Sequence, residues 1–244
     1  PPSGRRAHRP FPSRRGAAIT GSVELLEPQA IDRHGPRQAQ PLNYIPIELS
    51  DGVRGEVVTE CHAPTLSREL SGLLPSADVW RPWLAQLVTD HTALPGYATL
   101  KYSKSGEVFR ARFAGPHYKP LGVVCRYSRS DGRGASILKR PSRAQRNLRR
   151  AVRLLNVGID TAVPLARIER TAPPRSSWLV TEFVADVVDL DQIVLALLSH
   201  LDRRVLHKVK AGLSEALVEL FVHLYDARLY HRDLKASNIL FTHW

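Results

Sequence analysis

The chain ends in Tyr230-His231-Arg232-Asp233-Leu234-Lys235-Ala236-Ser237-Asn238-Ile239-Leu240-Phe241-Thr242-His243-Trp244. Within this stretch the pattern H-R-D-L-K-x-x-N specifies six positions and is followed at once by three apolar residues. A chance match to six specified positions has odds on the order of a few in a million. The stretch therefore decides how the rest of the chain is interpreted.

The pattern is typical of the catalytic loop of protein-kinase-like phosphotransferases. In such a loop Asp233 orients an acceptor hydroxyl and accepts its proton, and Lys235 neutralises charge on the transferred phosphate. Asn238 offers a neutral oxygen that suits Mg²⁺. We expect residues 239–241 to form a short buried strand that anchors the loop. The plainer alternative is an ordinary polar turn, because Asp and Asn are common in turns.

Composition indicates which kind of partner and which cellular compartment to expect. The chain has 244 residues, 43% of them hydrophobic, which is enough for a core. Its net charge of +12, from 35 basic and 23 acidic residues, favours an anionic partner such as an acidic lipid or a phosphorylated glycan. No zinc spacing, RNA-binding motif or interleaved aromatic residues accompany the charge, so no nucleic-acid partner is expected. Only Cys61 and Cys125 are present, which favours a reducing compartment.

The two ends of the chain look unlike its middle. Residues 1–41 are rich in Pro, Arg, Gly and Ser, which predicts a basic disordered extension. The chain contains no methionine. The second metal-binding carboxylate of such enzymes is expected roughly twenty residues beyond the catalytic loop, after Trp244. We therefore expect a fragment that is truncated after the catalytic loop.

Hydrophobic patterning predicts an α+β fold. Residues 42–95 are expected to be a lead-in segment with a short helix over 84–94. An antiparallel sheet of about five strands should follow in residues 96–184. Its expected elements are a hairpin over 98–113 with a turn at Ser105-Gly106, a strand over 121–127, a helix from Ser142 to Gly158, and strands over 162–168 and 177–184.

The last segment, residues 185–244, should begin a second lobe. Residues 189–201 look helical. Residues 205–225 carry apolar side chains at a period of 3.6, which predicts a long buried helix that leads into the catalytic loop. The expected order is that of a kinase fold: strands with one inserted helix, two further helices and then H-R-D. No stretch is long and apolar enough to span a membrane.

Three passages resemble the bacterial lipopolysaccharide kinase family, the Kdo and heptose kinases. They are Leu138-Lys-Arg-Pro-Ser-Arg-Ala-Gln-Arg with Leu154-Leu-Asn-Val-Gly-Ile-Asp-Thr-Ala-Val-Pro-Leu165, Ser177-Trp-Leu-Val-Thr-Glu-Phe183, and Leu229-Tyr-His-Arg-Asp-Leu-Lys-Ala-Ser-Asn-Ile-Leu240. The turn G-I-x-T-x-x-P-L is more typical of these sugar kinases than of Ser/Thr protein kinases. The resemblance covers about residues 100–241.

The resemblance implies a protein-kinase-like bilobal fold and ATP-dependent phosphorylation of a sugar hydroxyl in the lipopolysaccharide core, with Mg²⁺. It implies Asp233 as the catalytic aspartate and Asn238 as a metal ligand. The backbone of Glu182, Phe183 and Val184 would bind adenine as the hinge. An anionic glycolipid acceptor would place the protein in the cytoplasm, with peripheral contact at the inner face of the cytoplasmic membrane.

Two departures from the family pattern affect the nucleotide site. Cys125 aligns with the ATP-binding lysine, and Asn147 is nearest to the glutamate that normally pairs with that lysine. Arg126 or Lys101 is expected to supply the missing charge, and an alignment shifted by one residue puts Arg126 in the lysine's place. The alternatives to a sugar kinase are a Ser/Thr protein kinase and a catalytically inactive pseudokinase or fragment.

Overall fold

The structure is a computed structural model that describes residues 42–50, 52–61, 72–115, 119–129, 141–185, 187–197, 201–229 and 235–242. All of them belong to the second of two compact units, Pro36–Trp244. The predicted disordered extension over residues 1–41 lies outside the described residues.

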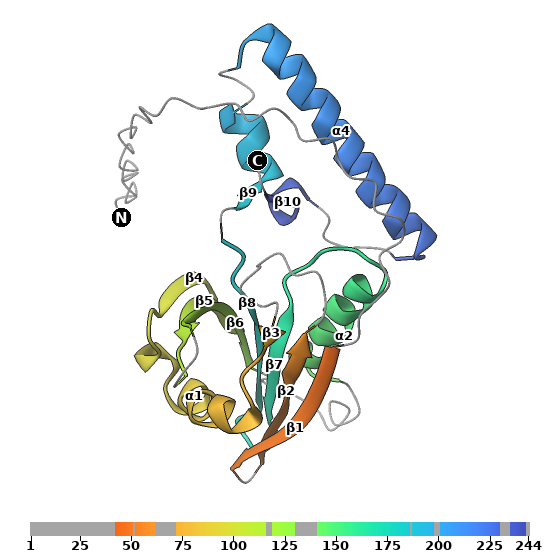
Figure 1. Ribbon diagram of the computed structural model, residues 1–244. Helices are drawn as coiled ribbons and strands as arrows, with labels where there is room; N and C mark the ends of the chain where they lie inside the picture. Colours follow the sequence, from red (N-terminus) through yellow and green to blue (C-terminus); the bar gives the residue numbers. More distant parts are fainter. Residues whose placement is uncertain are drawn as a thin grey trace, which may run out of the picture. The chain divides into compact units, whose positions relative to one another are not determined.

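An antiparallel sheet of eight strands dominates this part of the chain (Figure 1). Seven strands follow the order β1-β2-β7-β8-β6-β5-β4, and β3 pairs with β2. The strands are β1 Leu42–Ser50, β2 Val53–Cys61, β3 Gly72–Leu73, β4 Ala98–Ser103, β5 Gly106–Phe113, β6 Leu121–Arg129, β7 Pro164–Arg170 and β8 Ser176–Glu182.

Residues 96–184 contribute the five expected strands, β4 to β8, and residues 42–95 add three strands that were not expected. β2 pairs with β7, with Val57 opposite Ala166. Both of these residues are fully buried, as is Val58. β1 and β2 have nine residues each, but Pro46 in β1 and Gly55 in β2 weaken their sequence signal for a strand. Here the pairing with β7 selects the extended conformation.

The predicted hairpin is confirmed: β4 and β5 pair with Ser103 opposite Gly106, so the turn lies at Lys104-Ser105, one residue before the expected position. The predicted helix after β6 is also confirmed as α2, Arg143–Asn156. Ser142 caps it, because its Oγ accepts a hydrogen bond of 2.9 Å from the amide of Gln145. Gly158, at φ 76°, takes the left-handed conformation that ends a helix most easily.

Helix α1, Ala77–Thr89, covers one face of the sheet. Trp80, Trp83 and Leu84 are buried there, and Trp80 contacts Phe113 with ring centroids 4.1 Å apart. The predicted helix over 84–94 is wrong at both ends. Pro82 lies inside α1, where proline is normally unfavourable. Burial of the two tryptophans outweighs that cost, since a large buried side chain contributes about 1.5–3 kcal/mol.

Helix α2 lies on the opposite face of the sheet. Its Ala144 and Leu148 are buried against Leu179 of β8. Leu179 pairs with Arg126 across β6 and β8, whereas Cys125, the preceding residue of β6, belongs to the cluster under α1. Since successive residues of a strand point to opposite faces, α1 and α2 cover different faces.

The remaining elements are β9 Val187–Asp189, α3 Leu190–Gln192, the π-helical turn η4 Ile193–Leu197, α4 Arg203–Asp226, η5 Ala236–Asn238 and β10 Leu240–Thr242. The predicted helix over 205–225 is confirmed as α4. The helix expected over 189–201 begins as α3, capped by Asp189, and continues as η4. Residues 198–200 lie outside the described part.

Two burial expectations in this segment need correction. On α4 only Leu213 and Leu224 are buried, and Phe221 is 49% exposed. In β10, Leu240 is 50% exposed, so the strand after the catalytic loop is not the buried strand that was expected. Its pairing with β9, and not burial, holds it in place.

The predicted α+β class, with an antiparallel sheet and a helix inserted between β6 and β7, is confirmed. Among the residues that the structure describes, no helix is long and apolar enough to cross a membrane.

Candidate active site

Two of the predicted nucleotide-binding cations lie in one row across the sheet. Lys101 pairs with Val108, Val108 pairs with Arg126, and the row continues through Leu179 to Arg167. Residues that pair directly in an antiparallel sheet point to the same face. Lys101 and Arg126 are therefore on the α2 face, two strands or about 10 Å apart. Both long side chains can therefore reach a phosphate group that lies midway between the two residues.

Cys125 is on the wrong face for the role of the lysine. Its side chain is fully buried under α1, opposite Phe109 of β5. Burial raises the pKa of the Cys125 thiol, so it stays neutral. The structure thus favours the alignment shifted by one residue, in which Arg126 occupies the position of the lysine.

The charge of Arg126 lacks a carboxylate partner within the described part of the chain. Desolvation lowers the pKa of its guanidinium, and the nearby cation of Arg143 lowers it further. By contrast Arg167, further along the same row, forms ion pairs of 2.9 Å with both Glu56 and Glu169. Two neighbouring cations without a carboxylate make a favourable site for an anion such as a phosphate.

Helix α2 contributes no carboxylate to this face. Asn147, the residue nearest to the expected glutamate, is half-buried. Arg143 in the first turn of α2 is the neighbour of Arg126 instead. Sequence reasoning missed Arg143 as a member of the site. The repeated arginines of α2 were the available signal, but their position relative to β6 depends on the packing of the helix.

The hinge residues are held by the sheet. Glu182 is buried, and its carboxylate Oε1 accepts a hydrogen bond of 2.9 Å from the amide of Val163. The amide of Phe183 donates to the carbonyl of Gly122 at 2.9 Å. Val184 makes no hydrogen bond with any other described residue, so its amide and carbonyl remain available to a ligand. Of the three predicted hinge residues, Val184 is thus the one whose backbone makes no hydrogen bond within the described part of the chain.

The catalytic loop is described only in its second half. Asp233 lies in residues 230–234, outside the described part. Lys235 is exposed and directly precedes η5, where the amide of Asn238 donates to the carbonyl of Lys235 at 2.8 Å. The next residue, Ile239, accepts from the amide of Leu190 at 3.0 Å. This bond and the β9–β10 ladder hold the exposed Asn238 on a short, anchored turn.

The described residues include no group of three His, Cys, Asp or Glu side chains that could hold a metal ion together. Mg²⁺ needs no such group, because it keeps several waters and binds through one or two protein oxygens plus substrate phosphates. The amide oxygen of Asn238 is a ligand of the right kind, so the residues present fit a Mg²⁺–nucleotide complex.

A polar cluster around the buried Glu107 lies on the other face of the sheet, away from these residues. The carboxylate of Glu107 accepts hydrogen bonds from Tyr97 at 2.6 Å and Thr99 at 2.7 Å, and contacts His91 Nε2 at 3.1 Å. Burial alone would raise the pKa of Glu107, but these bonds outweigh it and lower the pKa. The cluster fastens the β4–β5 hairpin to the segment after α1 and is structural.

Comparison with known families finds one matching family model. The model of the Lipopolysaccharide kinase (Kdo/WaaP) family matches residues 135–243. The predicted resemblance is confirmed. The matched range runs from before α2 through η5 and β10, and so contains Asp233, Lys235 and Asn238. It supports a lipopolysaccharide kinase function in general terms, and with it the use of a nucleotide.

Lys101 and Arg126 precede the matched range, so their assignment rests on the sheet register alone. No curated protein and no solved structure matches the chain.

Proposed function

We propose that the chain is an ATP-dependent phosphotransferase that phosphorylates a sugar hydroxyl of the lipopolysaccharide core or a related glycan. The observation that carries this proposal is the H-R-D-L-K-x-x-N pattern inside the range matched by the lipopolysaccharide kinase family. We place the reaction in the cytoplasm, at the inner face of the cytoplasmic membrane, where a glycolipid acceptor is accessible.

In this proposal the nucleotide lies against the α2 face of the sheet. The backbone of Val184, with Glu182 and Phe183 holding the hinge, hydrogen-bonds adenine. Lys101 and Arg126 neutralise the phosphate oxygens, and Asn238 contributes an oxygen ligand to Mg²⁺. Bound Mg²⁺ offsets the negative charge of the phosphates.

The chemical step needs positioning more than covalent help from the protein. The acceptor oxygen forms a bond to the γ-phosphorus as the bond from that phosphorus to the oxygen of ADP breaks. The proton of the acceptor hydroxyl passes to the carboxylate of Asp233. The ammonium group of Lys235 neutralises charge that develops on the transferred phosphoryl group.

The test is transfer of labelled phosphate from ATP to core oligosaccharide by the full chain and by Asp233→Asn. We expect the substitution to lower the rate at least about a hundredfold, the lower range for loss of a general base. Nucleotide binding, followed as a rise in melting temperature with ATP and Mg²⁺, should persist. Asp191→Asn, which removes an exposed carboxylate of α3, is the matched control and should leave the rate unchanged.

The second candidate is a binding-only protein, because α2 has no carboxylate to pair with Arg126. Nucleotide binding without transfer to any acceptor would support it and refute catalysis. Transfer to protein serine or threonine but not to core oligosaccharide would replace the sugar kinase with a Ser/Thr protein kinase.

A further inference from the structure

Helix α2 carries a stripe of arginines along its whole length. Its sequence, RAQRNLRRAVRLLN, contains five arginines and no acidic residue. Apart from one adjacent pair, neighbouring arginines lie three or four residues apart, the spacing that places side chains on one face of a helix. The stripe consists of Arg143, Arg146, Arg149, Arg150 and Arg153.

The stripe faces solvent, and the sheet holds it there. All five arginines are exposed, whereas Ala144 and Leu148 on the other side of the helix are buried against Leu179. From Arg143 to Arg153 the stripe extends about 15 Å at the rise of an α-helix. Because the apolar side of α2 is already occupied by the sheet, this helix cannot insert into a bilayer and can act only through its charge.

The charges of the stripe are uncompensated within the described part of the chain. None of the five arginines pairs with a carboxylate there, and Arg146 donates to the carbonyl of Pro141. Like charges three and four residues apart destabilise a helix. Several arginines also lie near the positive end of the helix dipole, with no acidic residue in the first turn. These unfavourable interactions lower the stability of the helix. Their presence is best explained by an external polyanion that binds the arginines.

We propose that the arginine stripe of α2 is a docking surface for the phosphate groups of anionic lipids at a membrane surface. This inference rests on the proposed function, because a lipid-anchored acceptor must be reached at the membrane. Guanidinium groups bind phosphate oxygens through paired hydrogen bonds. A nucleic acid is the less suitable partner, since the stripe offers no aromatic side chain on which a base could stack.

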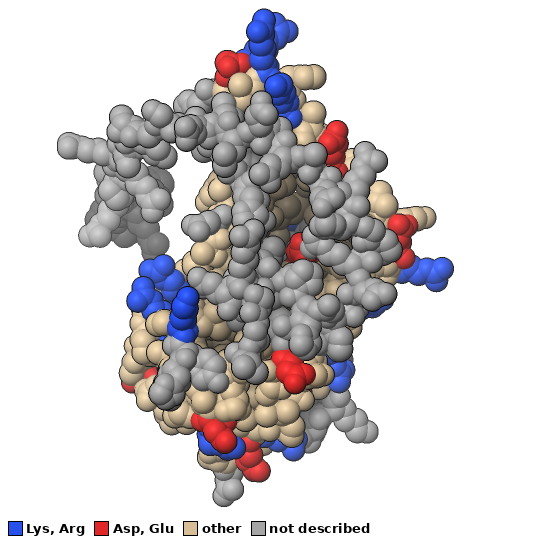
Figure 2. Space-filling view, viewed as in Figure 1, with Lys and Arg blue, Asp and Glu red and all other residues tan. Residues whose placement is uncertain are grey.

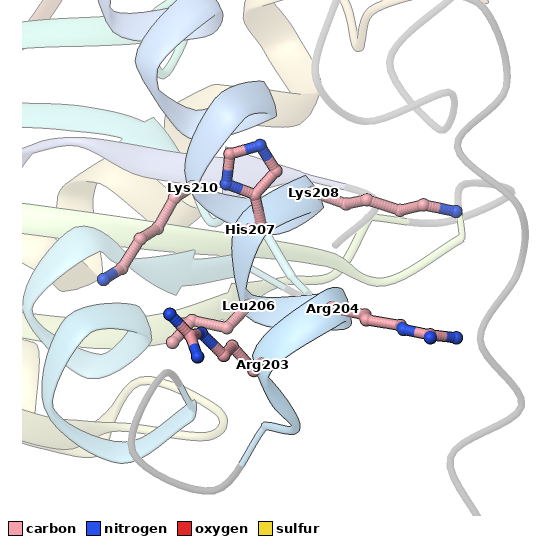
Figure 3. A pocket seen from close by; sticks show the side chains of 6 residues that line it. All are labelled: Arg203, Arg204, Leu206, His207, Lys208 and Lys210. Carbon is pink, nitrogen blue, oxygen red and sulfur yellow. The ribbon is translucent and has the colours of Figure 1, made fainter.

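A second basic cluster, at the start of α4, differs from the stripe in arrangement. Figure 2 shows lysine and arginine side chains gathered over this part of the molecule. In Figure 3, Arg204 and Lys208 point to one side of the helix while Arg203 and Lys210 point to the other. These four cations do not form one stripe along the helix, but they carry the same charge as four arginines of α2. They supply a control of equal charge.

The experiment is sedimentation of the full chain with vesicles of phosphatidylcholine alone or mixed with phosphatidylglycerol. The test variant combines Arg146→Gln, Arg149→Gln, Arg150→Gln and Arg153→Gln. It leaves out Arg143, which neighbours the proposed phosphate site. Each lost charge should weaken binding to the anionic vesicles about fivefold, so the variant should lose more than about a hundredfold. The same four positions changed to Lys should retain most of the binding.

The control variant combines Arg203→Gln, Arg204→Gln, Lys208→Gln and Lys210→Gln. It should bind the anionic vesicles within about fivefold of the unchanged chain. Circular dichroism and the melting temperature establish that each variant is folded. Equal losses in both variants, or equal binding to vesicles without phosphatidylglycerol, would overturn the docking surface. Binding of the unchanged chain to a single-stranded RNA oligonucleotide but not to the anionic vesicles would also overturn it.

Phosphate transfer to soluble, delipidated core oligosaccharide separates this proposal from the proposed function. The Gln variant of α2 should transfer to the soluble acceptor at an unchanged rate and show a raised KM only for acceptor embedded in vesicles. If the chain transfers phosphate to the soluble acceptor but does not bind vesicles, the docking surface is refuted and the proposed kinase activity is not. Vesicle binding that depends on α2 but comes without transfer refutes the proposed kinase activity alone.

Discussion

The two faces of the sheet differ in what they contribute, although the same strands build both. The α1 face buries Trp80, Phe113 and Cys125 in a dry apolar cluster. The α2 face carries Lys101 and Arg126 in one row, and α2 covers only part of it. Alternation along β6 puts Cys125 on one face and Arg126 on the other. Adjacent residues of one strand can thus serve stability and chemistry separately.

The largest expected effect lies on the α1 face. Trp80→Ala should lower the free energy of unfolding by about 3–5 kcal/mol, the usual cost of truncating a buried large aromatic residue. Urea denaturation followed by tryptophan fluorescence measures it. Trp80→Phe is the control and should cost much less, because the indole N–H of Trp80 has no acceptor among the described residues. A loss below about 1 kcal/mol for the Ala variant would show that the α1 face is not the source of stability.

On the α2 face, Arg126→Gln should weaken ATP binding about tenfold to a hundredfold. A hydrogen bond to a charged group is worth about 1.5–3 kcal/mol, and about 1.4 kcal/mol corresponds to a factor of ten. Isothermal titration calorimetry measures the Kd. Its neighbour Cys125→Ala is the control on the opposite face: it should reduce stability and leave the Kd of ATP unchanged. If the cysteine variant loses ATP binding and the arginine variant does not, the proposed register of β6 is wrong.

Glu107→Gln should lower the free energy of unfolding at neutral pH by about 1–3 kcal/mol, because the hydroxyls of the half-buried Tyr97 and the exposed Thr99 lose a charged acceptor. The effect should depend on pH. The folded state holds the pKa of Glu107 below its ordinary value of 4.5. Its contribution is therefore complete above about pH 4.5 and is lost as the pH falls through the lowered pKa.

The measurement for Glu107 is the urea midpoint of both proteins between neutral pH and about pH 3. The difference between them should shrink on acidification, while ATP binding at neutral pH stays unchanged because the cluster lies on the α1 face. A difference that is constant with pH would show that the ionised carboxylate is not what stabilises the cluster.

The smallest expected effect concerns the cap of α2. Ser142→Ala removes the acceptor for the amide of Gln145 and should lower the free energy of unfolding by about 1 kcal/mol. Chemical denaturation measures this change. Ser142→Asn keeps a capping oxygen and should retain most of the free energy of unfolding that the Ala variant loses. If both variants are equally unstable, the hydrogen bond from Ser142 to Glu169, and not the cap, is the important contact.

Local signals in the sequence predicted much of this fold. The hairpin turn at Ser105, the cap at Ser142 and the helical period of residues 205–225 each depend on residues close together in the chain. Strand β2 was missed because its extended conformation depends on pairing with β7, which lies about a hundred residues later in the chain, and β1 was missed with it because β1 pairs with β2 at the edge of the sheet. The bounds of α1 were missed because Pro82 was outweighed by tertiary burial.

The sequence by itself predicted the chemistry, because the spacing of Asp233, Lys235 and Asn238 is a local property of one loop. It also predicted the resemblance to the lipopolysaccharide kinase family, whose model matches a range that contains that loop. Only the tertiary structure decided between Cys125 and Arg126, because the face on which a strand residue lies depends on which partner strands and helices cover the sheet. The tertiary structure also showed that the arginines of α2 form one exposed stripe, because packing of Ala144 and Leu148 on Leu179 sets the orientation of the helix.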